Sequence, residues 1–299
     1  DPVIEPSTKE VPSEVALAKV APAATIPAER IDDEVPTLAA AIREPQPQQQ
    51  SDPVIAVAVT DKKAAVARSA QKSHAAKLTG FSLLPLAKAV GAAGYHGVTV
   101  PDSICYPKEA SSKYPYNADG SREFLESVPF LESLLAVPAL AAVTEQLRFA
   151  TFVYKLAVRQ VAGVAKQVQS IQAISNNRFD FGIGISAWEE DFAVMQTPWA
   201  KRGKRLDEQI DIIRGLETGE YFGYEGELHS IPANRMRPVP SQPTPLLVGG
   251  HSKVALNRAA LNGDGWMCAG AETDQLRSYI EQLNELRKQH GTQDKPFSI

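Results

Sequence analysis

The chain has few cysteines and no long apolar run. Its 299 residues include only two cysteines, Cys105 and Cys268, which are far apart and lack metal-ligand spacing. This scarcity argues against a disulfide framework and makes a reducing cytoplasm the simplest location. No apolar run approaches the roughly 18 residues that span a bilayer, and the acidic N-terminus lacks the apolar stretch of a secretory signal. The sequence therefore predicts a cytoplasmic protein without a membrane partner.

The sequence also lacks an excess of basic residues and the residue patterns of common catalytic sites. The formal net charge is −4, so the chain lacks the positive footprint of a nucleic-acid binder. No Ser/His/Asp grouping, Cys/His pair or metal-ligand spacing is visible in the sequence, which disfavours a hydrolase, a metalloenzyme and any metal site. A hydrophobic content of 43% with 22% charged residues is typical of a globular protein.

Residues 1–50 differ in composition from the rest of the chain. They are rich in Pro, Ala, Glu and Gln, contain no aromatic residue, and end in Pro45-Gln-Pro-Gln-Gln-Gln50. Such a segment buries too little apolar surface to offset the entropy lost on ordering. We expect a disordered tail or linker over residues 1–50 and a folded domain over residues 51–299.

Beyond residue 50, apolar runs of strand length alternate with helical patterns. The predicted strands are Val54–Val59, Gly97–Val100, Leu147–Tyr154, Phe179–Ile185, Pro245–Val248, Gly265–Cys268 and one starting at Pro296. The predicted helices are 83–93, Leu131–Thr144, Val161–Ile174, 201–217, Ser252–Leu261 and Thr273–His290, and a hairpin is expected over Tyr221–Ile231, turning near Glu225-Gly226. Short joints between strand and helix favour a parallel sheet.

The fold class that fits this order is an α/β barrel of the TIM (β/α)8 type. Its first strand, Val54–Val59, is atypical, and the last βα unit is missing from the sequence. A doubly wound open sheet is the competing fold, but the Gly-rich fingerprint that usually follows its first strand is absent.

The stretch Arg178–Trp188 has the period of a strand that ends in small residues. Gly182 and Gly184 carry no Cβ, so a ligand or another backbone can come close. Ser186 and Trp188 follow at the mouth of the strand. Two interpretations stay open: one wall of a ligand pocket, or a buried strand with packing glycines.

In a barrel the active site lies at the C-terminal ends of the strands. Most residues at these ends are small, hydroxylated or aromatic, which suits a flat aromatic cofactor that carries a phosphate. They are Asp102-Ser103, Phe152-Val153-Tyr154, Gly184–Trp188, Gly249-Gly250-His251-Ser252 and Trp266-Met267.

Gly249–Ser252 is the best phosphate candidate because it joins a strand to a helix, whose free N–H groups and positive end point at a ligand. His251 alone among the histidines sits at a predicted strand mouth. The alternative is an ordinary turn with Ser252 as the N-cap.

Three other segments have a residue pattern that bears on the site. The loop Ile104–Pro129 is too long for an idle connection and is expected to shape a substrate pocket. The basic cluster Lys201–Arg205 is either a pocket rim that meets an acidic cofactor tail or a solvated helix face. Glu189-Glu190-Asp191 is interpreted as solvated loop charge rather than an acid/base pair.

Taken together, these segments resemble the bacterial-luciferase-like superfamily of flavin- or deazaflavin (F420)-dependent oxidoreductases. The resemblance is carried by Gly94–Asp102, Leu147–Thr151, Asn177–Gly184 and Pro245–Met267, and it covers about residues 80–299. It implies a TIM-type barrel with F420, or alternatively FMN, at the strand C-termini, and a small-molecule substrate.

The resemblance also implies roles for individual residues. Gly249, Gly250, His251 and Ser252 would meet the cofactor phosphate, and Gly184, Ser186 and Trp188 would line its ring or ribityl side. A non-prolyl cis peptide near Phe152-Val153 would form a bulge that supports the ring. Several F420 dehydrogenases have a proton-transferring histidine after an Asp at the second strand. Here that pair is Asp102 and Ser103, which are the candidate catalytic residues.

The implied reaction is hydride transfer between a small organic substrate and F420. The first alternative is an FMN-dependent monooxygenase that uses reduced flavin and O2. The second is a non-catalytic, divergent barrel, which the missing first and last units suggest. An open barrel exposes sheet edges that promote association, so a homo-oligomer is expected.

Overall fold

The computed structural model describes residues 83–114, 117, 119–126 and 128–299. The predicted tail over residues 1–50 and the predicted first strand Val54–Val59 lie outside the described residues. The helices are α1 Leu83–Ala92, α2 Ser133–Ala142, α3 Val161–Ser175, α4 Glu189–Val194, α5 Arg202–Glu217, α6 Lys253–Asn262 and α7 Thr273–Gln289, with the short 3-10 helices η1 Glu123–Leu125 and η2 Leu156–Val158. The strands are β1 Gly97–Val100, β2 Arg148–Thr151, β3 Tyr154–Lys155, β4 Phe179–Gly184, β5 Phe222–Glu225, β6 Ser230–Asn234, β7 Leu246–Gly249 and β8 Gly265–Met267.

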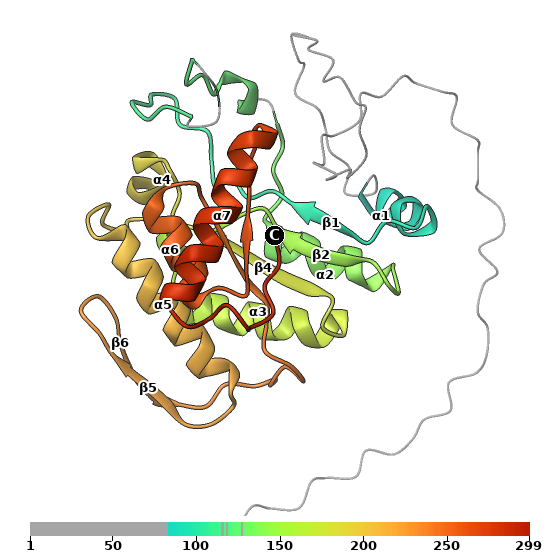
Figure 1. The fold of residues 1–299 in the computed structure, drawn as a ribbon. Coiled ribbons are helices and arrows are strands. Elements are labelled where there is room, and N and C mark those ends of the chain that lie inside the picture. The colour runs from blue at the N-terminus through green and yellow to red at the C-terminus, as the bar shows by residue number, and fades with distance from the viewer. Residues whose placement is uncertain (1–82, 115–116, 118, 127) are drawn as a thin grey trace, which may run out of the picture. The chain divides into compact units, whose positions relative to one another are not determined.

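The main sheet is parallel throughout, as the alternation of strand and helix predicts. Its order is β1-β2-β4-β7-β8, and β3 also pairs with β4. Ser298 makes a parallel bridge to Gly265 beside β8, where the sequence predicts a strand that starts at Pro296. Figure 1 shows the strands grouped together with helices around them.

The core forms where the inward faces of the strands meet the surrounding helices. Phe179, Phe181 and Ile183 of β4 are fully buried, and β4 has neighbours in the sheet on both sides. Strands covered on both faces are apolar along most of their length, which explains the nearly continuous burial of β4. Each buried side chain of this size contributes about 1.5–3 kcal/mol to folding.

Helix α3 illustrates how the helical pattern covers the sheet. Its buried apolar residues recur three or four positions apart, the spacing of one helix face: Val161, Val164, Ala165, Val168 and Ile171. The helix packs against α2 and α5. It ends where Asn176 adopts a left-handed conformation with φ of 54°, which an asparagine tolerates better than most residues.

The predicted hairpin is confirmed as the antiparallel pair β5–β6. Figure 1 shows it extending away from the main sheet. Among the described residues, none of the helices combines the length and the apolar character needed to cross a membrane.

Two predictions about local structure need correction. The predicted strand Leu147–Tyr154 is divided into β2 and β3 because the chain turns aside at Phe152-Val153. The interpretation of Glu189-Glu190-Asp191 as solvated loop charge is wrong. These residues form the first turn of α4, and Asp191 is 0% exposed. Acidic side chains are favoured in a first turn because the N-terminal end of a helix is positive.

Candidate active site

The parallel sheet brings the predicted site residues to one edge. Neighbouring parallel strands end at the same side of the sheet, so the segments that follow β1, β2, β4, β7 and β8 are neighbours there. Asp102 follows β1, Ser186 follows β4, and Gly250–Ser252 follow β7.

The predicted non-prolyl cis peptide is present between Phe152 and Val153. The chain leaves β2 at this bond and returns as β3, which pairs with Ile183 and Gly184 of β4. The Val153 side chain then lies over two glycines: a Cβ on Gly184 would come within 2.8 Å of Val153 Cγ2, and a Cβ on Gly249 within 2.9 Å of Cγ1. A bulge centred on Val153 therefore spans β4 and β7 at the edge where the strands end.

The neighbours of the β4 glycines bear on the open question about them. A Cβ on Gly182 would lie 1.9 Å from the Thr151 carbonyl oxygen and 2.5 Å from Met267 Sδ. Together with Val153 above Gly184, these contacts show that protein atoms occupy the space in front of both glycines. Gly182 and Gly184 therefore pack against protein atoms, and contact of Gly184 with a cofactor stays a prediction.

Asp102 is held in a dense set of polar contacts. Its Oδ2 accepts hydrogen bonds from the Lys155 backbone N–H and from Arg159 Nη1, both at 2.8 Å, and its Oδ1 accepts from Arg159 Nη2 at 2.9 Å. Arg159 also lies over the Tyr154 ring at 3.8 Å. Asp102 therefore ties the end of β1 to the segment after the bulge. Ser103 next to it is half-buried, and a catalytic role for this pair stays a prediction.

Ser186 organises the turn after β4. It has a φ of 61°, its hydroxyl donates to Asp191 Oδ2 at 2.5 Å, and its Oγ accepts from the Trp188 backbone N–H at 3.1 Å. Lys155 Nζ lies 2.7 Å from the same Asp191 oxygen and 4.3 Å from the centre of the Trp188 ring. Ser186 and Trp188 thus reach the predicted edge, but they do so as part of a buried charged cluster.

The long loop after β1 supplies the other side of this cluster. Arg122 lies 4.9 Å from the centre of the buried Trp188 ring and 3.7 Å from Glu190 Oε2. Glu190 Oε1 accepts from the backbone N–H groups of Ser111 at 2.8 Å and Ser112 at 3.2 Å. Burial opposes the charge of Glu190, but the hydrogen bonds from Ser112 and the neighbouring backbone outweigh it and lower the pKa of Glu190 to about 2.

Cys105 also faces the charged cluster. Burial raises the pKa of its thiol, and the negative charge of Asp191 adds to the rise. The thiol therefore stays protonated at neutral pH.

Sequence reasoning missed five of the charged residues at this edge: Arg122, Lys155, Arg159, Glu190 and Asp191. Lys155 and Arg159 come shortly after a strand end, the signal that selected the predicted residues. Asp191 was excluded because acidic runs are usually solvated. Arg122 lies within a long loop, where no periodicity indicates which side chains turn inward.

The corner Gly249–Ser252 has the geometry of a capped helix start. Ser252 Oγ accepts from the Ala255 N–H at 3.2 Å, so the N-cap interpretation of Ser252 is confirmed. Gly250 has a φ of 113°, a conformation that favours glycine, and its carbonyl accepts from Trp266 Nε1 at 2.8 Å. Contact of this corner with a phosphate stays a prediction.

His251 packs behind the corner. Its ring stacks on Tyr279, with centroids 4.9 Å apart, and its Nε2 accepts from the Ala269 N–H at 3.2 Å. Burial lowers the pKa of His251. Since Nε2 accepts a backbone hydrogen bond, the neutral ring carries its proton on Nδ1.

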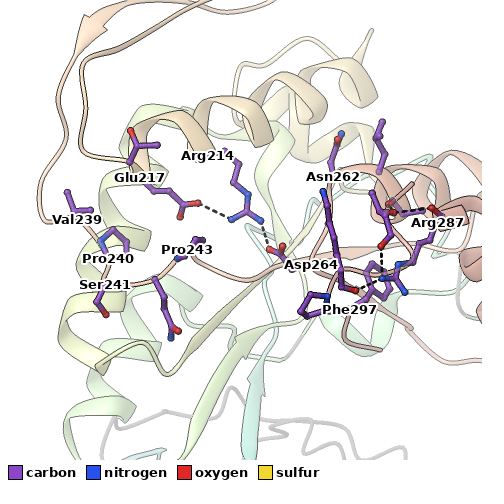
Figure 2. Close-up of a pocket in the computed structure, with 18 residues that line it drawn as sticks. Arg214, Glu217, Val239, Pro240, Ser241, Pro243, Asn262, Asp264, Arg287 and Phe297 are labelled. Carbon is purple, nitrogen blue, oxygen red and sulfur yellow. Dashed lines mark hydrogen bonds and ion pairs between the residues drawn. The ribbon is translucent and has the colours of Figure 1, made fainter. Parts of the chain in front are cut away.

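A cavity of about 600 Å³ lies elsewhere, at the amino ends of β7 and β8. Figure 2 shows Arg214 between Glu217 and Asp264 on its wall, with Arg287 and Phe297 farther along. Arg214 is paired with both carboxylates, and Arg287 donates to the backbone carbonyls of Thr292, Gln293 and Lys295. This end of a barrel serves stability rather than chemistry. In the described part of the chain, no group of His, Cys, Asp and Glu could hold a metal ion.

Comparisons with known proteins show the family and the fold. The sequence profile described as luciferase-like monooxygenase matches residues 65–299. An uncharacterized protein of Mycobacterium tuberculosis is 50% identical over 228 residues, which cover 76% of this chain and 78% of that protein. An F420-dependent glucose-6-phosphate dehydrogenase of Amycolatopsis mediterranei is 26% identical over 155 residues, which cover 50% of this chain and 46% of that enzyme.

A solved structure of a type II Baeyer-Villiger monooxygenase from Pseudomonas putida, in complex with FMN, has a TM-score of 0.56 at 15% identity. The match covers 70% of this chain and 57% of that chain, so this sequence spans less than two thirds of that protein. The predicted TIM-barrel fold is confirmed by this likeness.

Proposed function

The chain belongs to the luciferase-like monooxygenase family, and we propose that it is an oxidoreductase that transfers a hydride between a small organic substrate and deazaflavin F420. The observation that carries the proposal is the Val153 bulge, which sits at the carboxyl edge of the sheet beside the N-terminus of α6. The F420-dependent dehydrogenase among the relatives supports the choice of cofactor.

The residues at this edge fit such a cofactor. The first backbone N–H groups of α6 have no partner within the helix, and the helix end is positive. Gly250 carries no Cβ, and Ser252 is exposed at the surface of the corner. Lys253, also exposed, adds a positive side chain. Gly249–Ser252 would hold a phosphate, and the Val153 bulge would lie beneath the ring.

F420, when bound, would supply the hydride chemistry, and the protein would supply placement and electrostatics. Asp102 would act as a positioning residue, because both of its oxygens already hold the segment after the bulge. The Ser103 hydroxyl would donate a hydrogen bond to an oxygen of the substrate. Trp188, with the cluster around it, would exclude water from one side of the pocket.

A second candidate is an FMN-dependent monooxygenase that uses reduced flavin and O2. The description of the matching family and the FMN complex among the related structures favour it. A non-catalytic barrel is the second alternative.

Separate titrations of the protein with F420 and with FMN, followed by ring absorbance or fluorescence, test the proposal. We expect tighter binding of F420. Tighter binding of FMN would favour the monooxygenase, and binding of neither would favour the non-catalytic barrel.

The corner can be tested with two variants of one position. Ser252→Glu places a negative charge beside the expected phosphate, whereas Ser252→Gln has the same size without the charge. We expect S252E to bind the cofactor at least about tenfold more weakly than S252Q, because the carboxylate would repel a phosphate a few ångströms away by more than the roughly 1.4 kcal/mol of a tenfold change. If S252E and S252Q are equally stable and bind the cofactor with equal affinity, the cofactor phosphate does not lie at this corner.

A further inference from the structure

Arg122 is a buried cation whose hydrogen-bonding capacity is largely unused. The residue is 5% exposed, and neither Nη1 nor Nη2 makes a hydrogen bond with the part of the chain that the structure describes. Its ion pair with Glu190 is long, at 3.7 Å. Its guanidinium lies over the rings of Trp188, at 4.9 Å, and Tyr106, at 5.6 Å.

Such an arrangement is unfavourable without a further partner. Burying a charged group is costly unless it is paired and hydrogen-bonded, and the aromatic rings compensate only part of that cost. Glu190 directs its other oxygen, Oε1, to the N–H groups of Ser111 and Ser112, so its charge is shared with the loop. Within the described residues, the two terminal nitrogens of Arg122 therefore lack hydrogen-bond acceptors.

Lys155 brings a second cation to the same tryptophan. Its Nζ lies 4.3 Å from the centre of the Trp188 ring and 2.7 Å from Asp191 Oδ2, but without the geometry of a hydrogen bond. That Asp191 oxygen also accepts from Ser186. The ammonium group has three N–H donors, so it can donate a hydrogen bond to a ligand oxygen while it keeps its ion pair.

We propose that Arg122 and Lys155 form, beside Trp188, a binding subsite for an oxyanion of the substrate, a carboxylate or a phosphate. The two terminal nitrogens of an arginine match the paired oxygens of such groups. The inference rests on the proposed function in that it assumes a substrate at this edge. It narrows the substrate class to small molecules that carry a carboxylate or a phosphate.

The test uses the full chain without cofactor, so its result does not depend on whether F420 or FMN binds. Inorganic phosphate and acetate are titrated separately by calorimetry at neutral pH, and we expect a Kd on the order of 1 mM for at least one of them. Tighter phosphate binding identifies a phosphate-bearing substrate, and tighter acetate binding a carboxylate.

Three variants locate the binding. Arg122→Gln should weaken it at least about tenfold, because a charged hydrogen-bonding group is lost. Arg235→Gln is the matched control: Arg235 also pairs with a carboxylate, Glu220, and lies over a ring, Tyr221, but it is on the exposed hairpin. It should change the Kd less than about twofold. S252E should remove only the phosphate that binds at the helix corner, and it should leave acetate binding at Arg122 in place.

Arg122→Lys is a second variant, which keeps the proposal testable if R122Q does not fold. It keeps the charge but not the planar pair of donors, and it should bind more weakly than the native chain and more tightly than R122Q. The proposal is overturned if neither probe binds, which would mean that water satisfies the donors, if R122Q binds as well as the native chain, or if S252E alone abolishes all binding.

Discussion

At the scale of single residues, buried charged side chains fix the structure at the carboxyl ends of the strands. Asp191 is fully buried and contacts both Lys155 and Ser186. Asp102 likewise forms a buried ion pair with Arg159. Buried ion pairs of this kind give little net stability compared with apolar replacements, but removing one partner is strongly destabilising because the other charge is left alone.

Asp191→Asn should therefore lower the free energy of unfolding by about 3 kcal/mol. The amide has the size of the carboxylate but leaves Lys155 buried without a counter-charge. Equilibrium denaturation in urea measures the change. In the double variant D191N/K155M, the loss should be smaller than the sum of the two single losses.

Asp180→Asn is the control, because Asp180 pairs with Arg148 at 2.5 Å in a more exposed position. It should cost no more than about 1 kcal/mol. A loss in D191N that is no larger than in D180N would contradict the importance of the buried pair.

At the scale of secondary structure, the glycines of β4 allow the neighbouring chain to come close. Thr151 donates its hydroxyl to the Gly182 carbonyl at 2.7 Å, and the Thr151 carbonyl occupies the place that a Cβ of Gly182 would take. The close contact between β2 and β4 holds the start of the Val153 bulge, since β2 ends at Thr151.

Gly182→Ala should lower the free energy of unfolding by about 3 kcal/mol or more, because backbone atoms would have to move. Gly163→Ala is the matched change in α3, where a Cβ would meet nothing within 4 Å. It should raise stability by about 0.5 kcal/mol through helix propensity. Thermal and urea denaturation of both variants give the comparison, and similar effects of the two changes would refute it.

At the scale of the whole molecule, β1 is an outermost strand of the described sheet, with β2 as its neighbour. The sequence predicts a tail over residues 1–50 and a strand over Val54–Val59, which would be the neighbour of β1 in a barrel. These predictions, and that of a homo-oligomer, stay predictions.

Two deletions separate the tail from the strand. Removing residues 1–50 should change the free energy of unfolding by less than about 0.5 kcal/mol, because such a segment makes few stabilising contacts. Removing residues 1–60 should destabilise the chain clearly, since it takes the predicted strand as well. Equal losses in the two deletions, measured by urea denaturation, would contradict the proposed boundary.

Much of the fold could be predicted because its cause is local. The alternating apolar residues of β4 and the three- or four-residue spacing in α3 report burial directly, so element type and order follow from neighbours in the chain. The cis peptide at Phe152-Val153 was expected from a family resemblance rather than from residue chemistry. The observed helix ends differ from the predicted ones by a residue or two where a capping side chain sets the end. Helix α2, for example, starts after Glu132, whose side chain accepts a hydrogen bond from the Leu135 N–H at 2.9 Å.

The sequence by itself determined the parallel sheet and the strand ends that carry the predicted site residues, and it offered Ser252 as an N-cap only as one of two interpretations. Only the tertiary structure decided that Val153 covers Gly184 and Gly249, that Asp191 is buried, and that Arg122 and Lys155 share one tryptophan. The physical reason is distance along the chain. A side chain's charge is stabilised or left unpaired by residues tens of positions away, and no local pattern records which of them will face it.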